Sequence, residues 1–242
     1  MKSSGSTKLY CFSPPVMLAT FLIEIAFAFY VIWRYKMTVT TRLVVSILVC
    51  LATFQAAEYM ICGGMGLQGG TWSKLGYSAI SLLPALGIHL TLSIAKKKST
   101  LLLLAAYGSA VAFVAYYAFA TAAISGQTCY ANYAVFNTHT SSVVPYALFY
   151  YGWLIVGVGL AFQYATIQKV HAKALRALAL GYSAFIIPTS ALNMIDPTTI
   201  SGIPSIMCGF AVILAFVLVG RVAPESIAIK SPSQSLRLRF PF

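Results

Sequence analysis

Seven long apolar runs dominate this sequence, and each is about as long as a membrane-crossing helix. A helix needs about 20 apolar residues to cross a hydrocarbon core of ~30 Å. Lipid offers no partner for backbone N–H and C=O groups, so such runs must form helices or a closed barrel. The runs are continuous rather than alternating, which favours helices. The sequence therefore predicts an all-α bundle of seven transmembrane helices. The predicted spans are residues 13–33, 42–62, 75–95, 101–124, 145–167, 175–195 and 203–222.

The charge content excludes a water-soluble domain and a nucleic-acid-binding protein. Only 8% of the 242 residues are charged, whereas a soluble domain has roughly 25%. The net charge of +12 comes from bases in the short connections between the apolar runs, a pattern typical of membrane topology signals. The expected partner is the lipid bilayer, with no nucleic acid.

The distribution of bases predicts the orientation of the chain. Thirteen bases fall on one side of the predicted spans and three on the other, and the side rich in bases is normally cytoplasmic. The N-terminus is then outside, residues 1–222 form the transmembrane domain, and residues 223–242 form a short basic cytoplasmic tail. The expected location is the plasma (inner) membrane. The three outer bases are Lys2, Lys8 and Lys74.

Three ionisable residues fall inside predicted spans. Glu24 lies near the middle of the first span, Glu58 in the outer half of the second, and His89 in the third. Placing such a group in hydrocarbon costs ~2.5–3.5 kcal/mol on insertion scales, so these groups usually face a protein interior. Because consecutive helices with short connections tend to be neighbours, we expect the three side chains to converge.

Three interpretations of this trio remain open. The carboxyl groups could be neutral and hydrogen-bonded, with Gln55 near Glu58, and serve only helix packing. They could bind or relay a proton or a solute. Glu24, Glu58 and His89 could also hold zinc or iron, because all three are suitable ligands by type.

Prolines inside two spans suggest where a binding cavity would lie. Pro84 and Pro188 each free a backbone carbonyl group, and such breaks often adjoin cavities in membrane proteins. Asn193 belongs to a polar stripe that follows Pro188. We therefore expect an outward-facing cavity lined by the first, second, third and sixth spans. Its candidate ligand- or proton-binding residues are Glu24, Gln55, Glu58, His89 and Asn193.

Cysteines and aromatic residues add two expectations for the outer face. Cys11, Cys62 and Cys129 all fall there, and a disulfide between Cys129 and either Cys62 or Cys11 is consistent with an oxidising compartment. Tyrosines at the start of the fifth span, including Tyr146 and Tyr150, are typical of interface anchors. The polar segment 125–142 suits either a lid over the cavity or a loop on the lipid surface.

Three sequence features resemble an uncharacterised family of bacterial multipass membrane proteins. These features are the Cys11-Phe12-Ser13-Pro14 start, Gln55-x-x-Glu58 in the second span, and Pro84 in the third. Proteins of that family begin with Cys-Phe-Ser-Pro and carry Gln-x-x-Glu in the second helix. The likeness covers about the first 95 residues, but ten residues precede Cys11 here. The resemblance implies a bacterial plasma-membrane protein and supports Glu58 as a site, without implying any chemistry.

The favoured function is binding or transport of a small solute or proton through the outward-facing cavity. The first alternative is an accessory subunit of a membrane complex, and the second is an intramembrane metal-dependent enzyme. A small-molecule or ion ligand, a membrane protein partner and a second copy of the chain all remain open as partners. No cofactor is assigned. Enzymatic activity is not favoured, because nucleophile-elbow, phosphate-loop and haem-attachment motifs are missing from the sequence.

Overall fold

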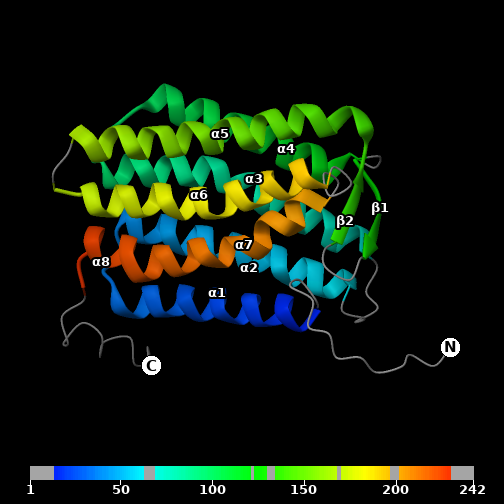
Figure 1. Ribbon diagram of the computed structural model, residues 1–242, viewed down its shortest axis with the longest axis horizontal. Coiled ribbons are helices and arrows are strands. Elements are labelled where there is room, and N and C mark those ends of the chain that lie inside the picture. Colours follow the sequence, from blue (N-terminus) through cyan, green and yellow to red (C-terminus); the bar gives the residue numbers. More distant parts are fainter. Residues whose placement is uncertain are drawn as a thin grey trace, which may run out of the picture.

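The computed structural model describes residues 14–62, 69–120, 123–129, 134–167, 170–196 and 202–229. Within these ranges seven helices are long and apolar enough to cross a membrane, which confirms the predicted number of spans. They lie side by side as one bundle (Figure 1). The helices are α1 (Pro14–Arg34), α2 (Val39–Cys62), α3 (Gly69–Ile94), α4 (Thr100–Phe119), α5 (Thr140–Ile167), α6 (Ala172–Ile195) and α7 (Ile203–Val217).

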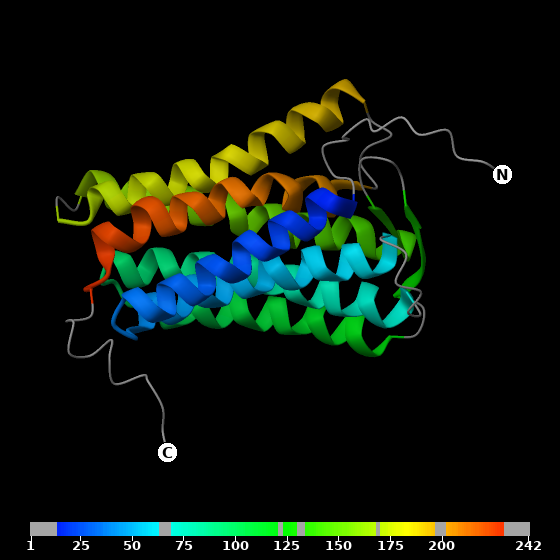
Figure 2. The same ribbon diagram turned by 90° about the horizontal axis from the view of Figure 1, so that it is seen from below.

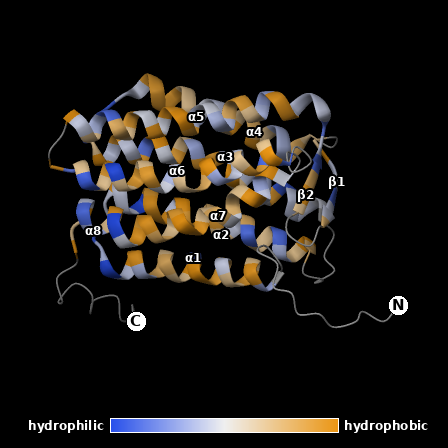
Figure 3. Ribbon diagram, viewed as in Figure 1, coloured by the Kyte–Doolittle hydropathy of each residue, from blue (hydrophilic) through white to orange (hydrophobic). Residues whose placement is uncertain are grey.

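The two ends of the bundle differ in composition. One end carries a β-hairpin, and we call it the hairpin end; α1 begins there (Figure 1). Every described base except Lys74 lies at or near the opposite end, which we call the basic end. Figure 3 shows that apolar residues (orange) dominate the middle of the helices. This separation of charge from apolar surface is what the base count along the sequence predicts.

Helix α3 is the centre of the bundle. It packs against α2, α4, α5 and α6 and against the hairpin, and it is the most enclosed of the seven described spans. Helix α6 departs from the bundle axis instead. Its later part (yellow to orange) diverges from α7 towards the hairpin end in Figure 2. Pro188 lies inside this helix, and proline in a helix interior is a common cause of such bending.

The segment between α4 and α5 forms an antiparallel hairpin of β1 (Ile124–Cys129) and β2 (Ala134–Thr138). The predicted end of the fourth span at residue 124 and the predicted start of the fifth at 145 are therefore wrong. Ala120 already has extended backbone angles, and α5 begins before Pro145, which it contains. Proline removes only one helical hydrogen bond, and that loss is tolerated near a helix start.

The last helix is longer than predicted and contains a local widening. The π-helical turn η2 (Leu218–Val222) follows α7 and leads into α8 (Ala223–Ser226). Pro224 cannot donate a backbone hydrogen bond to the turn before it, and such a loss favours a π-type turn. The backbone N–H of Lys36 then donates to the carbonyl oxygen of Ala228 at 2.9 Å. Residues 223–229 therefore pack at the basic end.

Gly87 permits the closest approach between α3 and α6. A Cβ atom at this position would lie 2.2 Å from the hydroxyl oxygen and 2.8 Å from the Cζ atom of Tyr182. Tyr182 is buried, so its ring has little room to move. The glycine is therefore needed for helix contact rather than for backbone flexibility.

We predict that Gly87→Ala lowers stability by about 1–3 kcal/mol, the usual cost of overpacking. The matched control is Gly108→Ala in α4, where an added Cβ has no neighbour within 4 Å. That variant should be neutral or slightly stabilising, because alanine favours helix over glycine. Thermal unfolding of the two purified variants checks the prediction, and equal midpoints would contradict it.

Candidate functional site

Glu24 of α1 and Glu58 of α2 form a buried pair of carboxyl groups. Their side chains are 0% and 1% exposed, and they are close enough to interact electrostatically. Among the residues that the structure describes, neither oxygen of Glu24 has a hydrogen-bond partner, and Oε1 of Glu58 has none either. Two of the three ionisable groups expected to converge therefore do so, inside the bundle.

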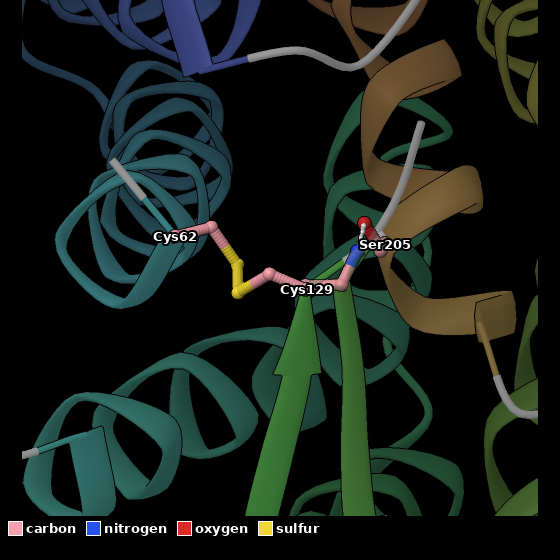
Figure 4. Close-up of a disulfide and its surroundings, with 4 residues drawn as sticks. Cys62, Cys129 and Ser205 are labelled. Carbon is pink, nitrogen blue, oxygen red and sulfur yellow. Dashed lines mark hydrogen bonds between the residues drawn. A yellow bond between two sulfur atoms is a disulfide. The ribbon is translucent and has the colours of Figure 1, made fainter. Parts of the chain in front are cut away.

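Ser205 of α7 connects this pair to the hairpin. Its hydroxyl group is within hydrogen-bonding distance of the Glu58 carboxyl group. The same oxygen accepts a hydrogen bond of 3.0 Å from the backbone N–H of Ala134, the first residue of β2. Figure 4 shows this contact beside the Cys62–Cys129 disulfide. Nothing in the sequence pattern singles out Ser205, because its role depends on three segments that are distant along the chain.

Other polar side chains lie near the two carboxyl groups, but none of them carries a positive charge. Cys208 of α7 lies within electrostatic reach of both carboxyl groups, and Tyr77 of α3 lies within reach of Glu58. Gln55, one helical turn before Glu58, is 2% exposed, and its Nε2 atom lacks a hydrogen-bond partner. We call Glu24, Gln55, Glu58 and Ser205 the carboxyl cluster.

His89 does not join the carboxyl cluster, contrary to expectation. Its Nδ1 atom lies 3.0 Å from the hydroxyl oxygen of Tyr107 in α4, and the two rings meet edge to face. His89 is half-buried. The side chain projects from the face of α3 that packs against α4, and not from the face towards α1 and α2 that we expected. It therefore contributes to the contact between α3 and α4.

The structure also gives no support to a metal site of Glu24, Glu58 and His89. Across the described ranges, no group of three or more His, Cys, Asp or Glu side chains could hold a metal ion. The three predicted ligands are all within those ranges. Their dispersal removes the geometric basis for the metal-dependent alternative.

A disulfide joins Cys62 at the end of α2 to Cys129 at the end of β1. This is one of the two pairings that the sequence leaves open, and Cys11 lies outside the described residues. The bond closes a loop with a sequence separation of 67 residues. The disulfide attaches β1 to α2, while Ser205 attaches β2 to α7.

A cavity of about 500 Å³ lies beside the carboxyl cluster, and we call it the hairpin cavity. Its walls come from α3, α4, α5, α7 and β2. They are mainly aromatic and aliphatic. No Lys, Arg, Asp or Glu is among the described residues that line it. The lining residues are Tyr77, Ile80, Tyr117, Val135, Phe136, Asn137, Thr138, Val143, Tyr146, Ala147, Tyr150, Tyr151, Ile203, Pro204 and Met207.

Contacts among the aromatic rings fix the shape of this cavity. The ring of Tyr77 lies 4.6 Å from that of Tyr117, 5.3 Å from that of Phe136 and 5.6 Å from that of Tyr146, between centroids. The Tyr146 hydroxyl group lies 3.2 Å from Ser81 Oγ. These tilted and edge-to-face ring contacts hold one another in place, and ligand sites are usually largely pre-formed.

The position of the cavity corrects two expectations. It was expected between the first, second, third and sixth spans, but of these only α3 contributes to its wall. None of Glu24, Gln55, Glu58, His89 and Asn193 lines it. The tyrosines at the start of α5 were expected to be interface anchors, yet Tyr146, Tyr150 and Tyr151 line the cavity. Their spacing along one helix face was the signal that could have shown this.

Comparisons of the chain with protein-family models, with curated proteins and with solved structures gave no match. The function is therefore inferred from the geometry of this chain alone. The resemblance to the Cys-Phe-Ser-Pro family stays an expectation from the sequence, and residues 11–13 of that motif lie outside the described residues.

We predict that Ser205→Ala lowers stability by about 1–3 kcal/mol. The substitution leaves the Ala134 N–H group and the Glu58 carboxyl group without their shared partner, and a buried unsatisfied polar group costs about that much. The control is Ser183→Ala in α6, whose hydroxyl group donates only to a carbonyl oxygen of its own helix. Thermal unfolding should separate the two variants, and a Ser205→Ala protein as stable as the control would refute the role of Ser205.

Proposed function

We propose that this chain is a multipass membrane protein that binds a small, largely apolar molecule in the hairpin cavity. The observation that carries the proposal is the cavity itself, with a volume of about 500 Å³ and an aromatic wall without charged side chains. Small-molecule sites typically have volumes of ~300–1,000 Å³ and mostly apolar walls with a few polar groups. The size and chemistry of the hairpin cavity fall within that description.

The polar groups of the cavity indicate a ligand with few hydrogen-bonding atoms. Asn137 and Thr138 of β2 lie on one wall. Tyr117 and Tyr151 reach the cavity from α4 and α5, but each hydroxyl group also has a serine partner, Ser142 and Ser190 respectively. Hydroxyl and amide groups orient a neutral ligand without requiring it to carry charge. A bulky ion would lose its hydration here without gaining a counter-charge from the wall.

We further propose that the hairpin end faces outward and the basic end faces the cytoplasm of a bacterial plasma membrane. Two observations support this orientation. The described bases gather at the basic end, and cytoplasmic connections are normally rich in Lys and Arg. The Cys62–Cys129 disulfide lies at the hairpin end, and disulfides persist in oxidising compartments outside the cytoplasm.

Fusions of alkaline phosphatase test this orientation, because that enzyme needs the oxidising side of the membrane to become active. A fusion after Thr138 in the hairpin should be active. A fusion after Lys98, which follows α3 at the basic end, should be inactive although the protein is present. The reversed pattern of activity would overturn the proposed orientation.

Filling the hairpin cavity should abolish ligand binding without unfolding the bundle. We predict that Ala147→Trp, which adds a large side chain to the cavity wall, removes saturable labelling of the cavity by a small apolar aryl diazirine. Mass spectrometry of the labelled wild-type protein should locate the probe on Tyr146, Tyr150 or Met207, which are all buried.

The matched control is Leu148→Trp, because the neighbouring side chain is 71% exposed on the outer face of α5. This variant should keep the saturable labelling of the cavity residues. Equal labelling in the Ala147→Trp and Leu148→Trp proteins would show that the probe binds elsewhere. Labelling that never saturates in the wild-type protein would also overturn the proposal.

A further inference from the structure

We propose that Glu24 and Glu58 form a buried proton-binding site in which Glu24 is held as the neutral acid while Glu58 changes its protonation with docking of the hairpin. This site is separate from the hairpin cavity, and it does not depend on what that cavity binds. The two glutamates have different roles because their surroundings differ.

Within the described ranges, neither carboxyl group has a positively charged partner. Both side chains are almost fully buried. The interactions that shape their environment involve each other, Ser205, Tyr77 and Cys208, and none of these groups is a base. Two buried carboxylates within electrostatic reach of each other and without a counter-charge would be strongly destabilising. At least one proton must therefore reside on the pair.

The two residues differ in their hydrogen bonding. Ser205 Oγ accepts the Ala134 N–H group at 3.0 Å, so its own hydrogen is free to point to Glu58. Glu58 is thus supplied with a donor that stabilises a carboxylate. Glu24 has no donor within hydrogen-bonding distance of either oxygen. The resident proton accordingly belongs on Glu24, and Glu58 is the group that ionises.

The elements packed against α2 carry several titratable groups. Helix α1 contributes Glu24, α3 contributes Tyr77, and α7 contributes Cys208. Strand β1 contributes Cys129, which is held in the disulfide and does not titrate. Helix α8 also packs against α2, and its acidic residue is the exposed Glu225. Among the carboxyl groups on these elements, Glu58 is therefore the one that contacts Ser205, the residue that binds the hairpin backbone.

Docking of the hairpin and ionisation of Glu58 favour each other. A carboxylate is a stronger acceptor than a neutral carboxyl group, so ionised Glu58 holds the Ser205 hydroxyl group in the orientation that leaves a lone pair for Ala134. Protonation of Glu58 weakens this arrangement. Since proton binding and docking are linked, falling pH should loosen β2 from α7, and rising pH should restore the contact.

Infrared spectroscopy of the full-length protein in lipid nanodiscs tests the assignment of the protons. The sequence contains only four acidic side chains, Glu24, Glu58, Asp196 and Glu225, so individual carboxyl bands can be resolved. At alkaline pH the wild-type protein should show one protonated carboxyl band that is shifted by deuterium exchange. Lowering the pH through neutrality should add a second buried band.

Three conservative variants assign these bands. Glu24→Gln should remove the band seen at alkaline pH, whereas Glu58→Gln should remove only the band gained on lowering the pH. The control Glu225→Gln should leave both. A wild-type protein without a protonated carboxyl band at neutral pH would overturn the proposal. So would a finding that sodium or calcium ions stabilise the pair with both carboxyl groups ionised. Loss of the alkaline-pH band in Glu58→Gln would overturn the division of roles.

Hydrogen exchange at the Ala134 amide tests the coupling. Its protection factor, corrected for the intrinsic pH dependence of exchange, should fall about fivefold as Glu58 becomes protonated, the difference expected between charge-assisted and neutral hydrogen bonds. Glu58→Gln should show the low value at every pH, and Glu225→Gln should behave like the wild type. A protection factor that changes equally with pH in Glu58→Gln would refute the coupling.

Discussion

The hydroxyl group of Ser205 joins α7, α2 and β2 at the hairpin end of the bundle. It contacts the buried carboxyl group of Glu58 and accepts the first backbone N–H group of β2. Both partners are enclosed by protein, so neither can turn to water if the contact is lost. The disulfide from α2 to β1 holds the other strand. Together these two attachments determine where the hairpin rests on the bundle.

The position of the hairpin in turn determines the cavity. Strand β2 supplies Phe136 and its neighbours to the wall, and the ring of Phe136 packs against both Tyr77 and Phe54. Tyr77 lines the hairpin cavity and also lies within electrostatic reach of Glu58. A change in hairpin docking would therefore reach both the proposed ligand site and the proposed proton site through side chains that already touch.

The sequence was sufficient for features that depend on composition and on local order. Long apolar runs determine seven helices, and the cost of burying carboxyl groups brings Glu24 and Glu58 together. The direction of His89 was not predictable, because α3 is enclosed on most sides and its apolar pattern does not distinguish α2 from α4. The cavity was also beyond sequence reasoning, since Phe136, Tyr146 and Met207 come from three separate segments. Ser205 is one of many hydroxyl groups, and only the fold shows what it joins.

A double-mutant cycle on Glu58 and Ser205 tests this account most directly. Glu58→Leu, Ser205→Ala and the double variant would be compared by the free energy of unfolding in mixed micelles. If the two groups satisfy each other, removing both should cost less than the sum of the single losses, with a coupling energy of about 0.5–3 kcal/mol. Strictly additive losses would mean that Ser205 and Glu58 act independently, and the hairpin end would then lack the connection described here.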